Sequence, residues 1–391
     1  MRLVRRSTMV ALLGVALLAA GVGVVGLATA LSTADSAPPE VIETPNSTSY
    51  VTPDAANVTR QEYAEASLDI GTAIVTDAER IQARHDELVV RDGEDSPART
   101  TIDMLEQRVE TLERRHEEVL ASYSRDEIST ETLLTELARL EVAAAEYRET
   151  IARLQEDGDL SGALTNRVSV VSVEPTMLDQ PVIEQVATAK TTGEESVRVY
   201  VAATDDGLVA ATVDGGRYVR QATLRDERNP FGDDQFAEGP EGRAQAASER
   251  GSSLYSVRAN TVRGFEGTHV YEYRADHELG EAFAYLDGAT TNPFHEHQYK
   301  EPVVSIPAQT SSSTGDAFRL NVQYTNATGP MAVSLVGANG DELTPIAISV
   351  EGQSVGTIQG SGELWTIQPL GEFTVTATAD NGETVSVRVI P

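Results

Sequence analysis

Residues 208–224 read LVAATVDGGRYVRQATL, and this stretch decides the fold class of the middle of the chain. Two apolar runs, Leu208–Val213 and Arg217–Leu224, flank Asp-Gly-Gly at positions 214–216. A glycine pair between two such runs is typical of a tight β-hairpin, because glycine accepts the positive φ angles that the turn requires. The stretch therefore predicts two antiparallel strands joined by a short turn.

More strands are predicted on both sides of this hairpin, so we expect residues 165–306 to form a β-rich α+β domain. Apolar and polar residues alternate there over short runs bounded by Gly, Pro, Asn or Asp, which is the pattern of half-buried strands. Residues 244–251 interrupt the pattern with a short predicted helix. The other predicted strands are Arg167–Val173, Ser196–Ala203, Leu254–Ala259, His269–Arg274, Ala282–Leu286, Phe294–Tyr299 and Val303–Ile306.

The C-terminal residues 316–391 are predicted to form an immunoglobulin-like β-sandwich. Short strands separated by glycines recur there every 8–12 residues or so, which is typical of two packed antiparallel sheets. Residues 308–315, rich in Ser and Thr, are expected to link this domain to the preceding one. The predicted strands are Phe318–Tyr324, Met331–Val336, Ile346–Val350, Ser354–Ile358, Leu364–Ile367, Glu372–Ala379 and Thr384–Ile390.

Helices are predicted throughout residues 60–160, and the first covers residues 60–91. The second and third carry apolar residues at alternating spacings of three and four, which is the seam of a coiled coil. Their short connection favours an N-terminal antiparallel helical bundle or coiled-coil hairpin within one chain, and coiled-coil pairing between chains is the rival arrangement. The apolar positions are Ile70, Ile74, Ala78, Ile81 and Leu88 in the first helix, Ile102, Leu105, Val109, Leu112, His116, Val119 and Tyr123 in the second, and Leu133, Leu137, Leu140, Ala144, Tyr147, Ile151 and Leu154 in the third.

Residues 1–34 have the composition of a signal peptide or a signal anchor. Arg2, Arg5 and Arg6 precede the apolar core Met9–Leu31, which is long enough to cross a bilayer as a helix. Ala-Thr-Ala at 28–30 is also an acceptable cleavage site. The segment fits either a cleaved signal or a retained anchor, exported by the general or the twin-arginine route. Either reading places the rest of the chain outside the cell.

Three sequons agree with export. The acceptors are Asn46, Asn57 and Asn326, each followed by Thr at the second position after it. Two of them lie in residues 35–59, whose Ser, Thr and Pro content predicts an exposed linker. We expect Asn46 and Asn57 to be accessible for glycosylation.

The chain is strongly acidic, with 61 Asp and Glu against 30 Lys and Arg and a formal net charge of −31. Such a charge repels itself at ordinary ionic strength, whereas salt near 1 M shortens the Debye length to about 3 Å. The composition therefore predicts a halophilic protein. It argues against nucleic acid as a partner and against docking on anionic lipid, so a membrane contact is expected only through the N-terminal segment.

Few residues point to chemistry. The chain has no Cys, and it lacks the G-x-S-x-G, H-E-x-x-H, P-loop and Rossmann glycine motifs, so we predict no catalytic residue and no cofactor. His295 and His297 share one face of a predicted strand, and a metal site is one hypothesis for them. His269 and His277 are the candidate further ligands because they lie near in the sequence. The alternative is that these histidines are structural.

Several motifs resemble uncharacterised secreted proteins of haloarchaea. The motifs are YSRDEIS at 123–129, LVAATVDGGRYVR at 208–220, HELG at 277–280 and YLDGAT at 285–290. The resemblance covers residues 40–305 and implies an origin and a compartment without an activity. Residues 348–356 and 371–377 resemble the immunoglobulin-like or carboxypeptidase-regulatory-like β modules of surface proteins, a likeness that implies a fold without a function.

Together these observations predict an exported cell-surface protein with a non-enzymatic structural or adhesive role. Cell-envelope proteins or glycans are the expected partners, and no oligomeric state is predicted. An exported hydrolase, metal-dependent or not, with its site in residues 200–300 is one alternative, and an extracellular ligand-binding module is another. A pocket gathering two or more of the four histidines would favour the hydrolase, whereas a pocket-free domain with a free sheet edge would favour adhesion.

Overall fold

An eight-stranded antiparallel sheet has the order β3-β4-β5-β6-β10-β9-β8-β7. The computed structural model describes residues 39–44, 47–91, 97–156, 160–236, 239–338 and 343–390. The predicted hairpin is confirmed near the middle of the sheet, where β5 (Gly207–Asp214) pairs with β6 (Arg217–Leu224) around two glycines at positive φ. The remaining strands are β3 (Arg60–Ala66), β4 (Val197–Ala203), β7 (Thr261–Gly264), β8 (Val270–His277), β9 (Gly280–Asp287) and β10 (Pro293–Lys300).

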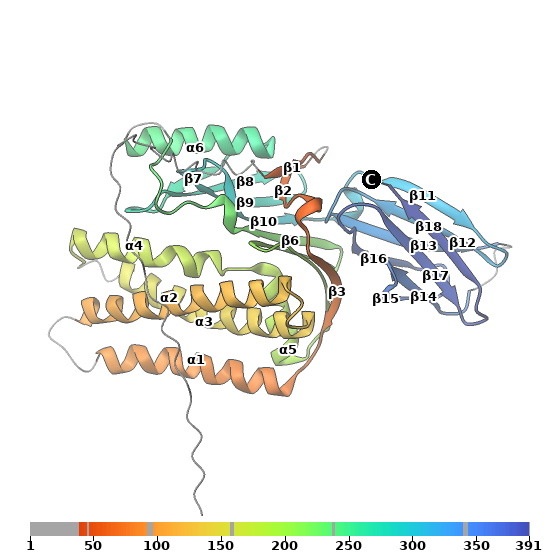
Figure 1. Ribbon diagram of the computed structural model, residues 1–391, viewed down its shortest axis with the longest axis horizontal. Coiled ribbons are helices and arrows are strands. Elements are labelled where there is room, and N and C mark those ends of the chain that lie inside the picture. Colours follow the sequence, from red (N-terminus) through yellow and green to blue (C-terminus); the bar gives the residue numbers. More distant parts are fainter. Residues whose placement is uncertain are drawn as a thin grey trace, which may run out of the picture. The chain divides into compact units, whose positions relative to one another are not determined.

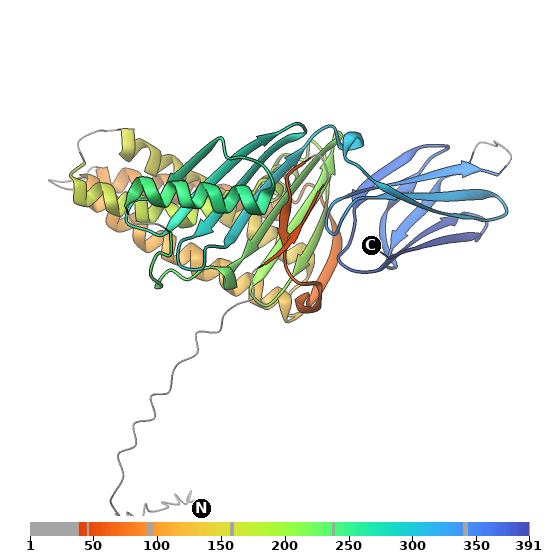
Figure 2. The same cartoon turned by 90° about the horizontal axis from the view of Figure 1, so that it is seen from above.

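Five of the described α-helices lie on one side of this sheet, and α6 lies on the other (Figure 1). On the first side α5 contacts β4, β5 and β6, and α3 contacts β3. On the opposite side α6 contacts β7, β8 and β9, and the green helix crosses these strands in Figure 2. The helices are α1 (Ile70–Arg91), α2 (Pro97–Ser124), α3 (Thr130–Glu156), α4 (Gly162–Met177), α5 (Pro181–Thr192) and α6 (Pro240–Tyr255).

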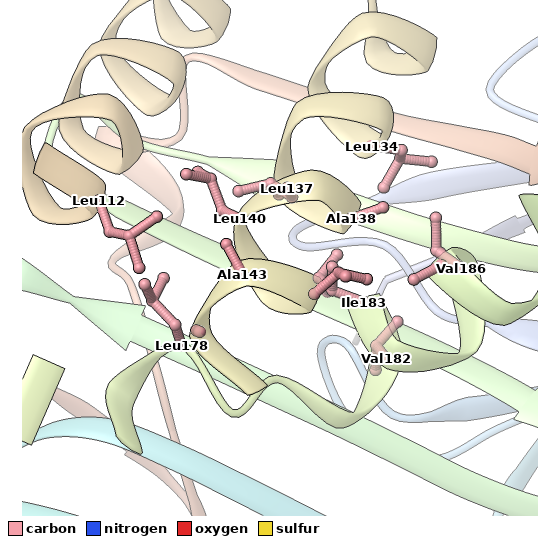
Figure 3. Close-up of a cluster of buried hydrophobic side chains, with 14 of the residues drawn as sticks. Leu112, Leu134, Leu137, Ala138, Leu140, Ala143, Leu178, Val182, Ile183 and Val186 are labelled. Carbon is pink, nitrogen blue, oxygen red and sulfur yellow. The ribbon is translucent and has the colours of Figure 1, made fainter. Parts of the chain in front are cut away.

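The prediction of a separate N-terminal helical bundle is wrong. Helices and sheet share one hydrophobic core, in which Leu137 and Ile183 belong to the same cluster as Val199 of β4 (Figure 3). The expected seam positions of α2 and α3 are indeed buried, apart from the half-buried Val119. The apolar face of the sheet must itself be covered, and these helices cover it. A periodic seam identifies a buried face but not the element that buries it.

Several predicted boundaries also differ. The run Arg167–Val173 lies within helix α4, because a helix that is apolar on several sides has no clear period over seven residues. Residues 60–66, predicted as helix, form edge strand β3. Residues 254–259 cover the end of α6 and the loop after it, and residues 303–305 form a short 3₁₀ helix.

The C-terminal part fits a β-sandwich, and all of its predicted strands are present. Its two four-stranded sheets have the orders β11-β12-β13-β16 and β15-β14-β17-β18. The expected linker 308–315 contains an additional edge strand, β11 (Gln309–Thr314), which pairs with β12 although its residues are mostly exposed. The other strands are β12 (Phe318–Tyr324), β13 (Pro330–Gly337), β14 (Ile346–Val350), β15 (Gln353–Ile358), β16 (Glu363–Ile367), β17 (Phe373–Ala379) and β18 (Thr384–Val389).

Edge strand β3 is covered by the sandwich. The Tyr63 hydroxyl donates to the Ile367 carbonyl at 2.5 Å, and the Tyr63 amide donates to Gln353 Oε1 at 2.8 Å. The Leu370 amide lies 3.2 Å from the Tyr200 hydroxyl of β4. These contacts satisfy polar groups at an edge that would otherwise be open to another strand.

The segment before β3 is also packed on the sheet. Strand β1 (Glu40–Ile42) pairs with β2 (Tyr50–Thr52), and residues 47–53 are buried rather than exposed as a linker would be. The predicted signal or anchor lies outside the described residues, as does Asn46. Within the described ranges, no helix combines the length and the apolar character needed to cross a bilayer.

Candidate ligand-binding site

A cavity of about 490 Å³ lies between α2, α4 and the ends of β6 and β10. Strand β6 ends at Leu224, and the chain then turns through a short 3₁₀ helix, so polar residues gather at this end of the sheet. The walls are Glu113, His116 and Glu117 of α2, Glu174 and Met177 of α4, Asp206, Thr223, Arg225, Asp226, Arg228, Pro230 and Phe231 around β6, and Phe294 and His295 of β10.

His116 is the least explained polar residue of this wall. It occupies a seam position of α2, its exposed fraction is 2%, and neither ring nitrogen has a hydrogen-bond partner among the residues that the structure describes. Burial lowers the pKa of His116 to about 3, and the positive charge of Arg225 adds to the effect. The ring is therefore neutral at neutral pH and offers one donor and one acceptor.

His295 and His297 point to the same face of β10, as predicted, and contact each other. Their Nε2 atoms lie 2.7 Å apart, and His295 Nδ1 lies 2.9 Å from Thr223 Oγ1. Burial holds the pKa of His295 well below its usual range and lowers that of His297 to about 3. Two neutral imidazoles thus share one hydrogen bond, and only His295 reaches the cavity wall.

The other two candidate ligands lie elsewhere. His269 Nδ1 is 3.0 Å from the Gly232 carbonyl, and His277 Nδ1 accepts from the Leu279 amide at 3.2 Å. Residues 269 and 277 stand at opposite ends of β8, because that strand runs from Val270 to His277. Across the described ranges, no group of three or more His, Cys, Asp or Glu is placed to hold one metal ion. The structure therefore brings together two of the four histidines.

The charges of the cavity wall are unequal. Its two guanidiniums are already paired, Arg228 with Glu174 at 3.2 Å and Arg225 with Glu113 at 3.7 Å and with Glu117. Burial raises the pKa of Glu174, and the charge of Glu113 raises it further. Burial also raises the pKa of Asp226, with a further contribution from Asp206. Five carboxylates against two guanidiniums leave the wall negative.

Apolar side chains form the rest of the wall. Phe294 and Met177 are buried, with exposed fractions of 3% and 5%, and the guanidinium of Arg228 lies 5.3 Å from the centre of the Phe294 ring. Phe231 is 97% exposed at the rim. The site thus combines aromatic surface, excess negative charge and an imidazole that has no hydrogen-bond partner within the described ranges.

Family comparisons divide the chain into three consecutive parts. The domain of unknown function DUF7096 matches residues 1–196, which is half of the 391 residues. The chain belongs to the DUF7096 family. After its DUF7096 part, residues 199–307 match a family of unknown function (DUF7094) and residues 309–386 match the archaeal fibronectin-III type-like domain. This agrees with the expected domains of unknown function followed by an immunoglobulin-like module. No curated protein matches the chain.

The cavity of this DUF7096 chain is built from two of these parts. The DUF7096 part supplies α2 and α4, and the DUF7094 part supplies β6 and β10. The sequence indicated His116 only as one position of an apolar seam, and it gave no signal for Glu174 or Arg228. A histidine in an otherwise apolar seam was the available clue. The cavity beside that histidine could not be predicted, because it is formed by the tertiary structure.

A buried charged cluster on the opposite face of the DUF7096 chain's sheet was also missed. Arg220 Nη1 donates to Glu296 Oε1 at 2.8 Å, and both side chains are fully buried. Arg220 Nη2 donates to the Val51 carbonyl at 2.5 Å, and Lys300 Nζ donates to the Thr48 carbonyl at 2.9 Å. Because β10 alternates its side chains, Glu296 and Lys300 face away from the histidines. The cluster holds the segment around β2 on the sheet.

The sequons differ in their surroundings. Asn57 is exposed in a 3₁₀ turn, as expected for an accessible acceptor. Asn326 is half-buried and donates to the Glu43 carbonyl at 3.1 Å. Its sequon partner Thr328 is fully buried and accepts from Arg220. Of these two, Asn57 is the sequon that the folded DUF7096 chain leaves open.

Proposed function

We propose that the protein is a non-enzymatic binding protein of the archaeal cell surface, and that the cavity between α2, α4 and the sheet receives its ligand. His116 carries the proposal. Buried polar groups almost always have a hydrogen-bond partner, so a buried imidazole beside an open cavity, with no partner for either nitrogen in the described part of the chain, favours a bound molecule there. The matching fibronectin-III-like domain supports an interaction role.

The walls favour a small organic cation with an apolar group. The excess of carboxylates attracts a positive charge. Asp226 and Asp206 repel each other, and a cation between their carboxylates would relieve this repulsion. Phe294 and Met177 provide the apolar surface. A primary ammonium would donate to these carboxylates, and to His116 once one of its ring nitrogens, which have almost no accessible surface in the free protein, turns toward the cavity.

Binding is favoured over catalysis because the histidines are poor proton carriers. A general acid or base works best with a pKa near the ambient pH, and burial lowers the pKa of His116 to about 3. A hydrolase is the second candidate because of Glu174. This residue lies in the cavity wall, and burial raises its pKa, as is common for catalytic carboxylic acids.

The test uses 2-phenylethylamine as the cationic probe, with 2-phenylethanol and 3-phenylpropionate as neutral and anionic controls. Thermal shift and calorimetric titration in 2 M salt should show binding of the amine only. His116→Phe should leave the free protein at least as stable, because no buried nitrogen stays unpartnered, and should abolish amine binding. Equal binding of all three probes, or unchanged binding by the variant, would refute the cationic site, and chemical conversion of the amine by the protein would replace the binding role with an enzymatic one.

Export to a salty cell surface is the second part of the proposal, and the N-terminal segment and the net charge of −31 support it. The test is mass spectrometry of the protein isolated from its own cells. We expect a glycan on Asn57, the exposed acceptor. Asn57→Gln should remove the corresponding mass. An unmodified Asn57 together with protection from protease added to intact cells would contradict a surface location.

A further inference from the structure

The outer face of one sandwich sheet carries the only tryptophan of the chain. Strand β16 alternates its side chains, so Leu364 packs against the sandwich core while Glu363 and Trp365 point outward. Trp365 is half-buried, packs on an apolar cluster that includes Ile367, and donates from its indole N–H to Glu363 Oε2 at 3.0 Å. The ring is therefore held in place and still reaches the surface.

The strand register places uncharged polar residues beside this tryptophan. Ala332 of β13 lies directly opposite Trp365, and Gln323 of β12 lies opposite Ala332. Thr310 of β11 completes the row, since it lies opposite Gln323. Residues directly opposite each other point to the same face of a sheet, so hydroxyl and amide groups extend from β11 to the indole ring. The neighbouring row on this face consists of Ser312, Asn321, Ser334 and Glu363.

This face lines a groove of about 360 Å³, a volume in the range of small-ligand sites. The rest of the lining is the segment 303–308 after β10, where the short 3₁₀ helix leaves Val304 69% exposed. Val303 and Ile306 anchor that segment, because both are buried. The sheet contributes Thr310, Gln323, Thr325, Pro330, Glu363 and Trp365. The groove thus combines an aromatic ring, an amide, hydroxyl groups and apolar side chains.

The groove is almost free of charge although the chain is strongly acidic. Among the described residues of its lining, Glu363 alone carries a charge, and its Oε2 already accepts from Trp365. In the next row of the sheet, Arg319 donates to Ser312 Oγ at 2.8 Å. The net charge of −31 repels anionic ligands, and a single paired carboxylate attracts a cation only weakly. The charge therefore favours a neutral, hydroxyl-rich ligand over an ionic one.

We propose that this groove binds a neutral oligosaccharide of a cell-envelope glycan, with a sugar ring stacked on Trp365. The C–H face of a pyranose ring carries partial positive charge and packs on the negative face of an indole. The Gln323 amide and the Thr310 hydroxyl both donate to and accept from sugar hydroxyls. Only the location of the glycan in the envelope rests on the proposed surface location of the protein.

A proline-rich peptide is the rival occupant of the groove. Such peptides dock on grooves lined by several aromatic side chains, whereas Trp365 is the one aromatic residue in the described lining. The hydroxyl and amide row across four strands also suits the many hydroxyls of a sugar better than a peptide with few donors. The sugar is therefore the better fit.

Trp365 is itself the reporter for the test, because no other tryptophan contributes to the emission. The full chain in 2 M NaCl is titrated with neutral tetrasaccharides of glucose, of mannose and of galactose. We expect at least one of them to shift the tryptophan emission to shorter wavelength and to protect it from quenching by acrylamide. The affinity should be the same in 0.5 M NaCl, because the sugar makes no ion pair. A tetragalacturonate and a proline-rich decapeptide are the anionic and peptide controls.

Variants separate the groove from other surfaces. Gln323→Ala should weaken sugar binding about 3–10-fold, the usual cost of losing a hydrogen bond between neutral groups, and should leave the fold intact because Gln323 is exposed. Gln107→Ala is the matched control, since Gln107 is also an exposed glutamine but lies on α2. Trp365→Ala should abolish the binding measured by calorimetry. His116→Phe should bind the sugar like the parent, because His116 lies in the other cavity.

The outcomes that would overturn the proposal are distinct. Unchanged emission with all three neutral sugars is one of them. Binding of the tetragalacturonate or of the peptide in place of the sugars is another, and it would make the groove an anion site or a peptide site. Equal losses of affinity in Gln323→Ala and Gln107→Ala would show that the sugar binds elsewhere.

Discussion

Lys300 is a single residue whose burial has a measurable consequence. It is 1% exposed, and burial lowers its pKa to about 7 despite the nearby charge of Glu296. Between about pH 7 and pH 10 the unfolded chain therefore holds a proton that the folded chain lacks, so the free energy of unfolding rises with pH across this window. The slope contributed by this one group is at most about 1.4 kcal/mol per pH unit.

Lys300→Met removes that contribution. Urea unfolding at pH 7, 8 and 9 measures the free energy of unfolding of both proteins. Relative to the parent, the variant should be most stable at pH 7, and this difference should shrink by pH 9. Other buried groups titrate as well, among them Glu141 with a pKa raised to about 8 by burial, so the comparison is the difference between the two proteins at each pH. Parallel profiles for variant and parent would mean that Lys300 keeps its proton in the folded state.

At the scale of elements, the close packing of α6 against β8 depends on one glycine of the helix, Gly251. A Cβ on Gly251 would lie 2.3 Å from Cδ2 of Tyr273 on β8. Tyr273 cannot retreat, because it is fully buried and stacks on Tyr255 with ring centres 5.5 Å apart. We expect Gly251→Ala to destabilise the protein by about 1–3 kcal/mol, even though alanine favours a helix by up to about 1 kcal/mol.

Gly162→Ala is the matched control for this prediction. Gly162 begins α4, and a Cβ there meets nothing within 4 Å. The substitution should be neutral or stabilise by about 0.5–1 kcal/mol. Chemical unfolding of both variants measures the difference, and similar effects of the two alanines would show that α6 tolerates the extra carbon.

The elements also show how far the sequence was informative. The hairpin at 208–224 was predictable because its turn and its strands are local, and the sandwich strands were predictable for the same reason. Helix α4 was not, because its apolar residues are buried by several partners and leave no single period. The apolar positions of α1 were recognised, but the sequence could not show that Thr72 and Ala83 would face inward. The orientation of this helix is set by its ion pairs to α3. The cavity depends on the same non-local packing.

At the scale of the whole molecule, the boundary between the two unknown-function parts does not separate two folds. Residues 1–196 contribute β3 and the layer of α1–α5, while residues 199–307 contribute the other seven strands of the same sheet. Their apolar residues belong to one cluster, in which Leu105 and Val201 both take part. Neither part has a complete core without the other, so the two sequences are constrained to remain together.

The net charge of −31 leads to the last prediction, which concerns salt. Exposed carboxylates occur on helices, turns and strands alike, so the folded chain repels itself as a whole and not at one site. Raising NaCl from 0.1 to 2 M shortens the Debye length below the spacing of most surface charges, and Tm should rise by at least ~5 °C, equivalent to roughly 4 kcal/mol for a chain of this size. Replacing the exposed Glu194, Glu195 and Glu278 by Gln makes the net charge less negative by three units. It should raise Tm at low salt and leave Tm at 2 M salt unchanged. If the triple variant instead shows the same salt dependence as the parent, the stabilisation by salt does not come from screening of this charge.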